Sequence, residues 1–250
     1  MRKIVLITIA FIASLNAQEI YATFNIEADK SANLAFYSSG IVERVFVDVS
    51  SELKKGQRLA KLQNDDLVAS LNIAKAKLQE AEVTLNFSKR DYERQLLIKE
   101  LIDEAKFDQY TLAYERAKVA LSSAKANLDY QKALLDRSVV LAPFDGVILE
   151  KSVEVGDVVS GMMLRTIFKI QSKNKRKLIF EFDQKYWKVV KVGDSVKYSV
   201  NGDDNNYTGK ISKVYPVASS DNRKIKAEVE ADGFVVGLFG EGYINVVDKK

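Results

Sequence analysis

Residue types able to carry out covalent or metal chemistry are almost absent from this sequence. It contains no His and no Cys, and its Met residues are Met1, Met162 and Met163. Without an imidazole or a thiolate, a Ser-His-Asp triad, a His-ligated zinc site and a cysteine nucleophile are all impossible. Met162 and Met163 leave a single thioether pair as soft-metal ligands. There is no Gly-rich phosphate-binding loop. These residue types argue against most enzyme classes, and we expect no cofactor.

Composition and charge narrow the possible partners. The chain has 250 residues, enough for two or three small domains, and its hydrophobic content of 47% is ordinary for folded protein. The net charge is +4, and basic and acidic residues are mixed along the chain. Because no basic stripe is present, nucleic-acid binding is not favoured.

Two segments far apart in the sequence repeat one pattern of glycine and apolar residues. Gly40 opens the first segment and Gly56 follows 16 positions later, whereas Gly146 opens the second and Gly161 follows 15 positions later. Each later glycine lies at the centre of an apolar-x-x-Gly-x-x-Leu motif. Such a repeat indicates two similar units that pack on each other to bury their apolar faces.

The residues between these two segments have the periodicity of paired helices. No Pro or Gly interrupts residues 64–141. In two runs, mostly apolar residues recur at alternating spacings of four and three. This period places them along one side of each helix, where they form a seam with a partner helix. We expect four leucines in the seam: Leu78, Leu85, Leu121 and Leu128. The full runs are Leu67, Leu71, Ala74, Leu78, Ala81, Leu85, Ser88 and Tyr92, then Phe107, Tyr110, Tyr114, Ala117, Leu121, Ala124, Leu128, Gln131 and Leu135.

The reversal between the two runs is expected near Lys99–Asp103. Asp103 can cap the second helix, and Asp65 or Asp66 can cap the first. Each arm of about 33 residues would extend ~50 Å. A long intermolecular coiled coil would show the same periodicity. The short turn and the matched arm lengths favour an antiparallel hairpin within one chain.

The remaining sequence has the alternation of short strands. Residues 20–36 alternate apolar and polar side chains. The charged stretch 173–177 is interpreted as a solvated linker. Asn201-Gly202 supplies a turn among the later strands. Short strands with regular turns suggest a closed barrel. The expected later strands are 178–182, 196–200, 209–214, 225–229 and 242–246.

The N-terminus is typical of an export signal. Arg2 and Lys3 precede an apolar run from Ile4 to Leu15, which is too short to span a bilayer. Cleavage after Ala17 is expected, although Leu15 is a poor match to the small residue usual at that place. An uncleaved anchor and a buried strand are the alternatives.

In the order and spacing of its motifs the chain resembles the periplasmic adaptor, or membrane fusion, proteins of Gram-negative tripartite efflux pumps. Leu141–Gly146 looks like the Ala-Pro-Phe-Asp-Gly entry to the second lipoyl half of that family, and Gly40–Leu62 looks like the first half. Pro143 would stop the returning helix, and Gly146 would supply the turn into the next strand. Further segments resemble the family's β-barrel domain: Val192–Val196, Gly209–Pro216, Arg223 and Leu238–Gly242.

The resemblance implies an α+β fold. It consists of a split lipoyl-like β-sandwich with an inserted antiparallel α-helical hairpin, plus a small antiparallel β-barrel domain. It also implies a compact form without the membrane-proximal domain of larger adaptors. The expected parts are a signal peptide (1–17), the β-barrel (18–33 and 171–250), the lipoyl or barrel-sandwich hybrid domain (34–64 and 139–170) and the helical hairpin (65–138).

The function implied by the resemblance is mechanical, and the chain is not expected to be an enzyme. It would link an inner-membrane transporter of the resistance-nodulation-division (RND) class to a TolC-like outer-membrane channel. It would sit in the periplasm, associated with the inner membrane, in a ring for which the resemblance implies six copies. The ring would form part of a sealed conduit for drugs or other toxic compounds. Family members grip the channel through an Arg-x-x-x-Leu…Ser pattern at the hairpin tip. The closest match is Arg94, Ile98 and Asp103, with Ile for Leu and Asp for Ser.

Several alternatives remain open. The chain could serve an ABC-type exporter, type I secretion or a metal-efflux pump whose other subunits select the ion. A passive periplasmic tether is a further possibility. Lipoyl domains of enzymes carry a cofactor on a lysine at a hairpin turn, but here the helical insertion occupies that turn and there is no Met-Lys-Met motif.

Overall fold

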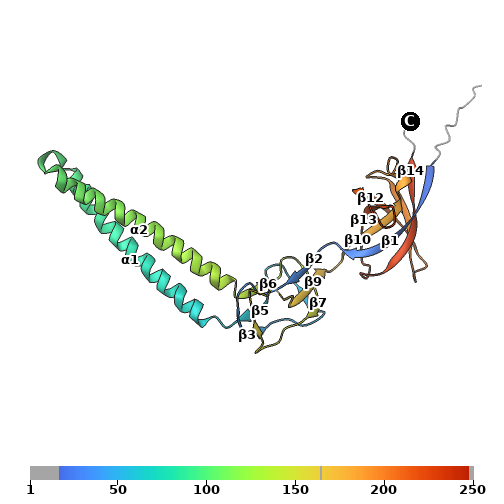
Figure 1. Ribbon diagram of the computed structural model, residues 1–250, viewed down its shortest axis with the longest axis horizontal. Helices are drawn as coiled ribbons and strands as arrows, with labels where there is room; N and C mark the ends of the chain where they lie inside the picture. Colours follow the sequence, from blue (N-terminus) through green and yellow to red (C-terminus); the bar gives the residue numbers. More distant parts are fainter. Residues whose placement is uncertain (1–16, 164, 248–250) are drawn as a thin grey trace, which may run out of the picture. The chain divides into compact units, whose positions relative to one another are not determined.

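The computed structural model describes residues 17–163 and 165–247. The described residues form two compact units, one made of residues 17–31 and 171–247 and the other of residues 32–163 and 165–170 (Figure 1). The predicted signal peptide lies outside the described residues, apart from its last residue, Ala17. Within the described part of the chain, no helix is long and apolar enough to cross a bilayer.

The first unit is a closed antiparallel barrel with strand order β1-β10-β13-β12-β11-β14. Its core contains the inward residues of each alternating strand, such as Ile20, Phe24, Phe180 and Ile244. A short 3-10 helix, η2 (Gln184–Tyr186), follows β10. The strands are β1 (Ala17–Ala28), β10 (Lys175–Asp183), β11 (Ser195–Val200), β12 (Asn206–Ala218), β13 (Lys224–Asp232) and β14 (Phe239–Val247).

The charged stretch 173–177 is not a solvated linker, and that interpretation was wrong. Lys175–Lys177 begin β10, and Arg176 is buried. Its guanidinium donates to the carbonyls of Ser172, Lys173 and Phe234 at 2.6–2.8 Å. Burial lowers the pKa of Arg176, but these carbonyl acceptors satisfy its donors, so the side chain ties a turn to the barrel.

The second unit contains a sandwich of two four-stranded sheets, β2-β9-β7-β4 and β6-β5-β3-β8. If β2 to β5 of the first half are matched in order with β6 to β9 of the second, the two sheets have the same strand order. This confirms the two similar halves expected from the repeat. Gly40 pairs with Val159 and Gly146 pairs with Leu53, so the two opening glycines occupy equivalent places. The strands are β2 (Ser31–Leu34), β3 (Gly40–Val45), β4 (Glu52–Leu53), β5 (Arg58–Leu62), β6 (Val139–Leu141), β7 (Gly146–Lys151), β8 (Val158–Val159) and β9 (Phe168–Ser172).

The motif at the entry to the second half joins the two halves. The amide of Gly56 donates to the carbonyl of Ala142 at 2.8 Å, and the amide of Lys55 donates to the Asp145 carboxylate at 2.7 Å. Pro143 lies between these two acceptors, in the connection from β6 to β7. Gly161 is needed for close approach, because a Cβ there would overlap the carbonyl of Tyr37. The sequence motif is therefore a structural joint.

Similar four-residue turns recur at the sandwich corners. In 54–57 and 154–157 the third residue is a glycine at positive φ, 80° for Gly56 and 94° for Gly156. The amide of the first residue donates to the side chain of the fourth, Gln57 or Asp157. Residues 48–51 form the same arrangement, but the third position holds Ser50 at φ 67°. A residue with a Cβ is strained there.

The hairpin extends from this sandwich as α1 (Asp65–Leu96), η1 (Lys99–Leu101) and α2 (Glu104–Asp136) (Figure 1). The reversal is where the sequence predicts it, and Asp103 caps α2 by accepting from the Lys106 amide. The predicted cap of α1 is wrong. Asn64 holds the N-cap position, while Asp65 and Asp66 lie in the first turn, where their charges favour the helix dipole.

We predict that Ser50→Gly stabilises the sandwich by about 0.5 kcal/mol. Removing Cβ relieves roughly 1 kcal/mol of left-handed strain, which exceeds the ~0.5 kcal/mol of added chain entropy that glycine loses. The matched control is Gly56→Ser, which places a Cβ at the equivalent position and should destabilise. Urea unfolding followed by hydrogen exchange of sandwich amides measures both changes. A destabilised Ser50→Gly variant would contradict the strain argument.

Candidate docking site at the hairpin tip

The base of the hairpin is held by a buried polar contact. The side-chain amide of Asn64 donates to Ser138 Oγ at 3.0 Å, and that hydroxyl donates to the carbonyl of Leu135 at 2.6 Å. The Leu62 amide donates to the Ser138 carbonyl at 2.9 Å. Asn64 and Ser138 are both buried. The chain therefore enters and leaves the hairpin at one fixed point.

The shaft of the hairpin is stabilised along the seam between α1 and α2. Leu71, Ala74, Phe107 and Ala117 are its buried residues. The predicted seam leucines are all half-buried, whereas their flanking neighbours in the sequence are exposed: Leu78, Leu85, Leu121 and Leu128. Small residues such as Ala74 and Ala117 let the helices approach closely, and this packing makes the insertion a stiff rod.

An aromatic cluster holds the end of the rod. The ring of Tyr92 lies 5.2 Å from that of Tyr114, stacked, and 5.7 Å from that of Phe107. The Lys99 ammonium lies 5.1 Å from the Phe107 ring centre, in cation–π geometry. The first residue of η1 is thus fixed to the first turns of α2, so the reversal has a defined shape.

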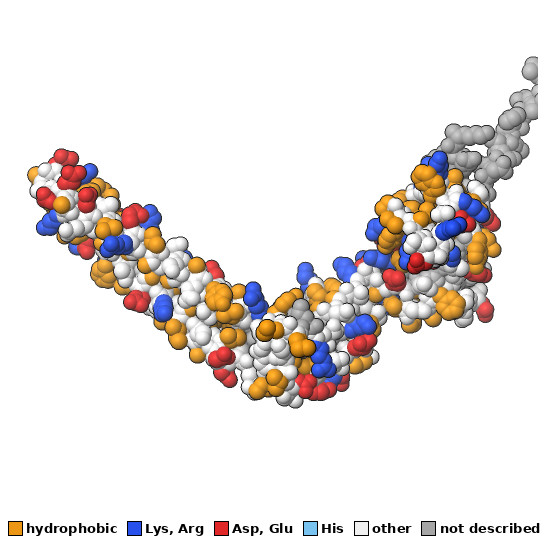
Figure 2. Space-filling view, viewed as in Figure 1, with side chains coloured by type: hydrophobic (Ala, Val, Ile, Leu, Met, Phe, Trp, Pro, Cys, Tyr) orange, Lys and Arg blue, Asp and Glu red, His pale blue; other side chains and the backbone are white. Residues whose placement is uncertain are grey.

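Exposed leucines project from this reversal. Leu97 is 86% exposed and Leu101 is 85% exposed, the highest values among the leucines of the described hairpin. Hydrophobic side chains also occur along the shaft, among charges of both signs (Figure 2). At the tip, Leu97 and Leu101 lie beyond Leu96, the last residue of α1. An apolar group exposed on a stiff support is typical of an interaction surface.

The three tip residues implied by the resemblance lie in three different local settings. The Arg94 guanidinium pairs with Asp91 on its own helix, and both side chains are largely exposed. Ile98 is 41% exposed at the start of η1. The Asp103 carboxylate accepts from the Lys106 amide at 3.3 Å. Each has a local role, and their role in gripping a channel stays a prediction.

Leu97 and Leu101 were missed by reasoning from the sequence. The signal was present, because Leu96-Leu97-Ile98 and Leu101 place four apolar residues at a reversal where polar residues are usual. The Arg-x-x-x-Leu pattern instead favours Arg94. The apolar group at the tip is the better-supported feature.

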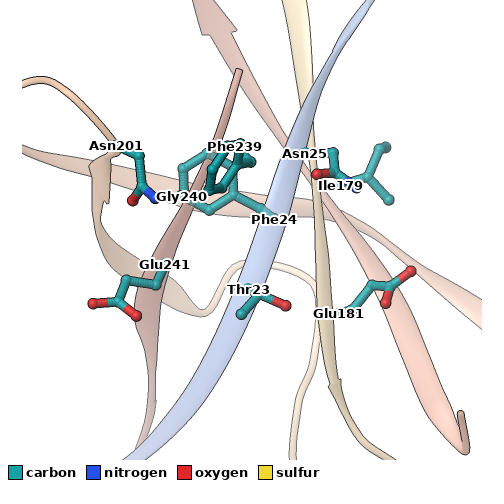
Figure 3. Close-up of a pocket in the computed structure, with 9 residues that line it drawn as sticks. All are labelled: Thr23, Phe24, Asn25, Ile179, Glu181, Asn201, Phe239, Gly240 and Glu241. Carbon is teal, nitrogen blue, oxygen red and sulfur yellow. The ribbon is translucent and has the colours of Figure 1, made fainter. Parts of the chain in front are cut away.

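A second candidate is a pocket of about 230 Å³ on the barrel, over β1 between β10 and β14 (Figure 3). Glu181 and Glu241 lie on opposite sides of Thr23 in this view. Both carboxylates are engaged, since Glu241 accepts from the Tyr21 hydroxyl at 2.8 Å and Glu181 pairs with Lys226 at 3.5 Å. The hydrogen bond to Glu241 raises the pKa of Tyr21. These two contacts link β1 to β14 and β10 to β13.

Among the described residues, no group of three or more His, Cys, Asp or Glu side chains is arranged so that it could hold a metal ion. With the tip leucines, the stiff shaft and the clamped base, the geometry favours contact with another macromolecule.

The split sandwich with its inserted helical hairpin corresponds to a known protein family. The model of the CzcB-like barrel-sandwich hybrid domain matches residues 30–171, more than half of the chain. This chain therefore belongs to the CzcB-like barrel-sandwich hybrid family. The expected fold class is confirmed by this match and by the sheet topology.

Curated relatives of this chain carry different names, one for metal resistance and one for macrolide export. The chain is 24% identical over 208 residues to the cobalt-zinc-cadmium resistance protein CzcB of Cupriavidus metallidurans, covering 80% of this chain and 39% of that protein. It is 29% identical over 161 residues to the macrolide export protein MacA of Yersinia pestis, covering 57% and 43%. The chain thus spans about two fifths of the length of these curated relatives.

The likeness also extends to solved structures. The crystal structure of MacA from Actinobacillus actinomycetemcomitans has a TM-score of 0.73 and 19% sequence identity, covering 92% of this chain and 80% of that one. At this level of identity the comparison shows a shared fold.

We predict that Leu121→Asp destabilises the hairpin by about 2 kcal/mol or more, because it places an unpaired charge in the apolar seam. Ala120→Asp is the matched control, since Ala120 is exposed one position away. The control should cost only a few tenths of a kcal/mol. Thermal melting followed by helical circular dichroism measures both. Equal melting of the two variants would show that Leu121 is not in the seam.

Proposed function

We propose that the chain is the periplasmic adaptor subunit of a tripartite efflux pump. In this proposal it links an inner-membrane RND-type transporter to a TolC-like outer-membrane channel and catalyses no reaction itself. The observation that carries the proposal is the stiff antiparallel hairpin ending in exposed Leu97 and Leu101. Membership of the CzcB-like family and the fold shared with MacA support it.

The hairpin has the dimensions for reaching across a gap. Its helices have 32 and 33 residues, which corresponds to ~50 Å at 1.5 Å per residue. Reach alone would be of little use in a flexible arm. The seam, the aromatic cluster and the Asn64–Ser138 clamp keep both helices in register, so that a contact at the tip can transmit force to the sandwich.

Each part has a separate role in the proposed pump. The tip meets the channel, the sandwiches of neighbouring copies pack side by side into a ring, and the barrel docks on the transporter. Six copies is the number implied by the family resemblance. The working location is the periplasm at the inner membrane, and the transporter supplies the energy. The sealed ring would conduct drugs or other toxic compounds.

Arg94, Ile98 and Asp103 remain proposed channel contacts beside the leucines. The Arg94–Asp91 pair is exposed, and exposed pairs contribute less than about 1 kcal/mol. Arg94 can therefore exchange Asp91 for a carboxylate or carbonyl of the channel at little cost, and its planar guanidinium suits such acceptors.

A metal-efflux pump is the second candidate. It is favoured by the CzcB-like model and by the relative named for cobalt, zinc and cadmium resistance. The chain contains no His or Cys, so the ion would be selected by other subunits. Comparing growth of a deletion strain on macrolides and on zinc, cobalt and cadmium salts distinguishes the two cargo classes.

We predict that Leu97→Asp combined with Leu101→Asp abolishes export while leaving the fold intact. Two carboxylates at the tip remove the apolar contact and require desolvation of charge on docking. Drug or metal tolerance of cells whose only copy is the variant measures this, with circular dichroism on the same protein. Val119→Asp, at an exposed site on the shaft, is the control. Tolerance equal to wild type at equal expression would contradict the tip assignment.

We also predict that Arg94→Asp abolishes tolerance through the same interface. The change loses an i,i+3 pair and places two acids together, which should cost the helix only about 0.5 kcal/mol. Lys89→Asp disrupts an exposed pair with Glu93 on the same helix and is the matched control. Unchanged tolerance in the Arg94 variant would leave Arg94 as a solvated charge, with the leucines as the remaining contact.

A further inference from the structure

We infer that the barrel unit binds the surface of an anionic lipid bilayer through a patch centred on Trp187. We call this the Trp187 patch and define it by Trp187, Pro216 and Val217 with Lys185 and Lys188. The inference goes beyond the proposed function, because it requires no transporter, channel or second copy of the chain.

The backbone around Trp187 is fixed. The Lys185 amide donates to the Asp183 carboxylate at 2.9 Å, and the Trp187 amide donates to the Gln184 carbonyl at 3.0 Å. The neighbouring Tyr186 packs on the barrel core. Trp187 nevertheless remains 62% exposed. A large apolar side chain is thus held outward by an ordered turn, and it is not a displaced core residue.

An irregular part of β12 supplies the other side of the patch. The pairing of β12 with β13 changes register between Val214 and Ala218. Within this interval Pro216 and Val217 are exposed, and Val217 is 70% exposed. A groove of about 580 Å³ separates them from Trp187, and it is lined by Gln184, Lys185, Trp187, Val214, Tyr215, Pro216, Val217, Ala218 and Ile225.

Two lysines lie against the aromatic rings of this turn. The Lys188 ammonium is 5.2 Å from the Trp187 ring centre, and the Lys185 ammonium is 4.8 Å from the Tyr186 ring centre. Such lysines bury their stems against apolar surface and keep the charge at its edge. Asp183 lies 3.9 Å from the Lys185 ammonium, and Arg223 adjoins the turn through its carbonyl. Within residues 183–188, Lys185 and Lys188 therefore outnumber the one acidic residue, Asp183.

This combination fits a membrane interface better than a protein. Indole rings prefer the headgroup region, where the ring is in apolar surroundings and the N–H stays wet. Lysines beside them are attracted to anionic headgroups. A stable protein interface buries well over about 1,000 Å², whereas this patch offers a few side chains. Shallow insertion into the headgroup region would bury Trp187 and Val217 and leave the lysines beside the anionic headgroups.

The test uses the fact that Trp187 is the chain's one tryptophan. Its fluorescence reports this patch alone, even if the apolar N-terminal run binds lipid independently. We expect vesicles of phosphatidylcholine with phosphatidylglycerol to shift Trp187 emission to shorter wavelength and to protect it from acrylamide. Pure phosphatidylcholine vesicles should have a much weaker effect.

The charged part of the patch is tested by Lys185→Glu with Lys188→Glu. Each lysine should contribute roughly fivefold in affinity for the anionic vesicles, so we expect at least about a tenfold loss for the double variant. Lys197→Glu with Lys210→Glu is the charge-matched control, at exposed positions on β11 and β12. It should lose less than the patch variant.

Three outcomes would overturn the inference. One is unchanged Trp187 emission and quenching with anionic vesicles, which needs no variant. Another is equal binding to both vesicle types or an equal loss in the control. The third is a shift seen only when an inner-membrane transporter is present in the vesicles, which would make the patch a protein-docking surface. None of these outcomes bears on the tip variants. Failure of the lipid-binding inference can therefore be told apart from failure of the adaptor proposal.

Discussion

The pairing of β5 with β6 is the contact on which the second unit depends. It joins the strand that precedes the hairpin to the strand that follows it, with Lys61 opposite Val139. The clamp beside it connects Asn64 and Ser138, which are 74 positions apart. Closing such a long loop costs entropy, although the cost rises only slowly with length. We expect the packing of α1 on α2 to offset part of that cost, because it holds the two ends of the insertion close together.

Most of the fold could be predicted from the sequence because its determinants are local. Gly56 and Gly146 indicate turns because glycine has the backbone freedom that turns need. The spacing of Leu121 and Leu128 indicates one face of a helix. Asn64 and Arg176 were not found, because their roles depend on distant partners. The Asn64 amide is used by Ser138, and Arg176 is satisfied by carbonyls that include that of Phe234. In sequence, one looks like a helix cap and the other like a solvated charge.

The candidate site was predictable in place but not in composition. The reversal near Lys99 follows from the two seams. Which side chains it exposes depends on where α1 ends, and that is at Leu96. Had the helix continued by one turn, Leu97 would lie on a helical face with neighbours at i±3 and i±4. Because α1 ends at Leu96 and η1 follows, a run of ordinary helix-forming residues becomes an exposed apolar group.

The chain contains no His and no Cys, so neither side chain can take part in recognition by this subunit. Relatives named for cobalt-zinc-cadmium resistance and for macrolide export match this sequence at 24% and 29% identity. What the proposed role demands is mechanical, namely the turns of the sandwich, the seam of the hairpin and the clamp at its base. On that proposal, selection lies in the transporter, and the surfaces of this chain are constrained by the neighbours they contact.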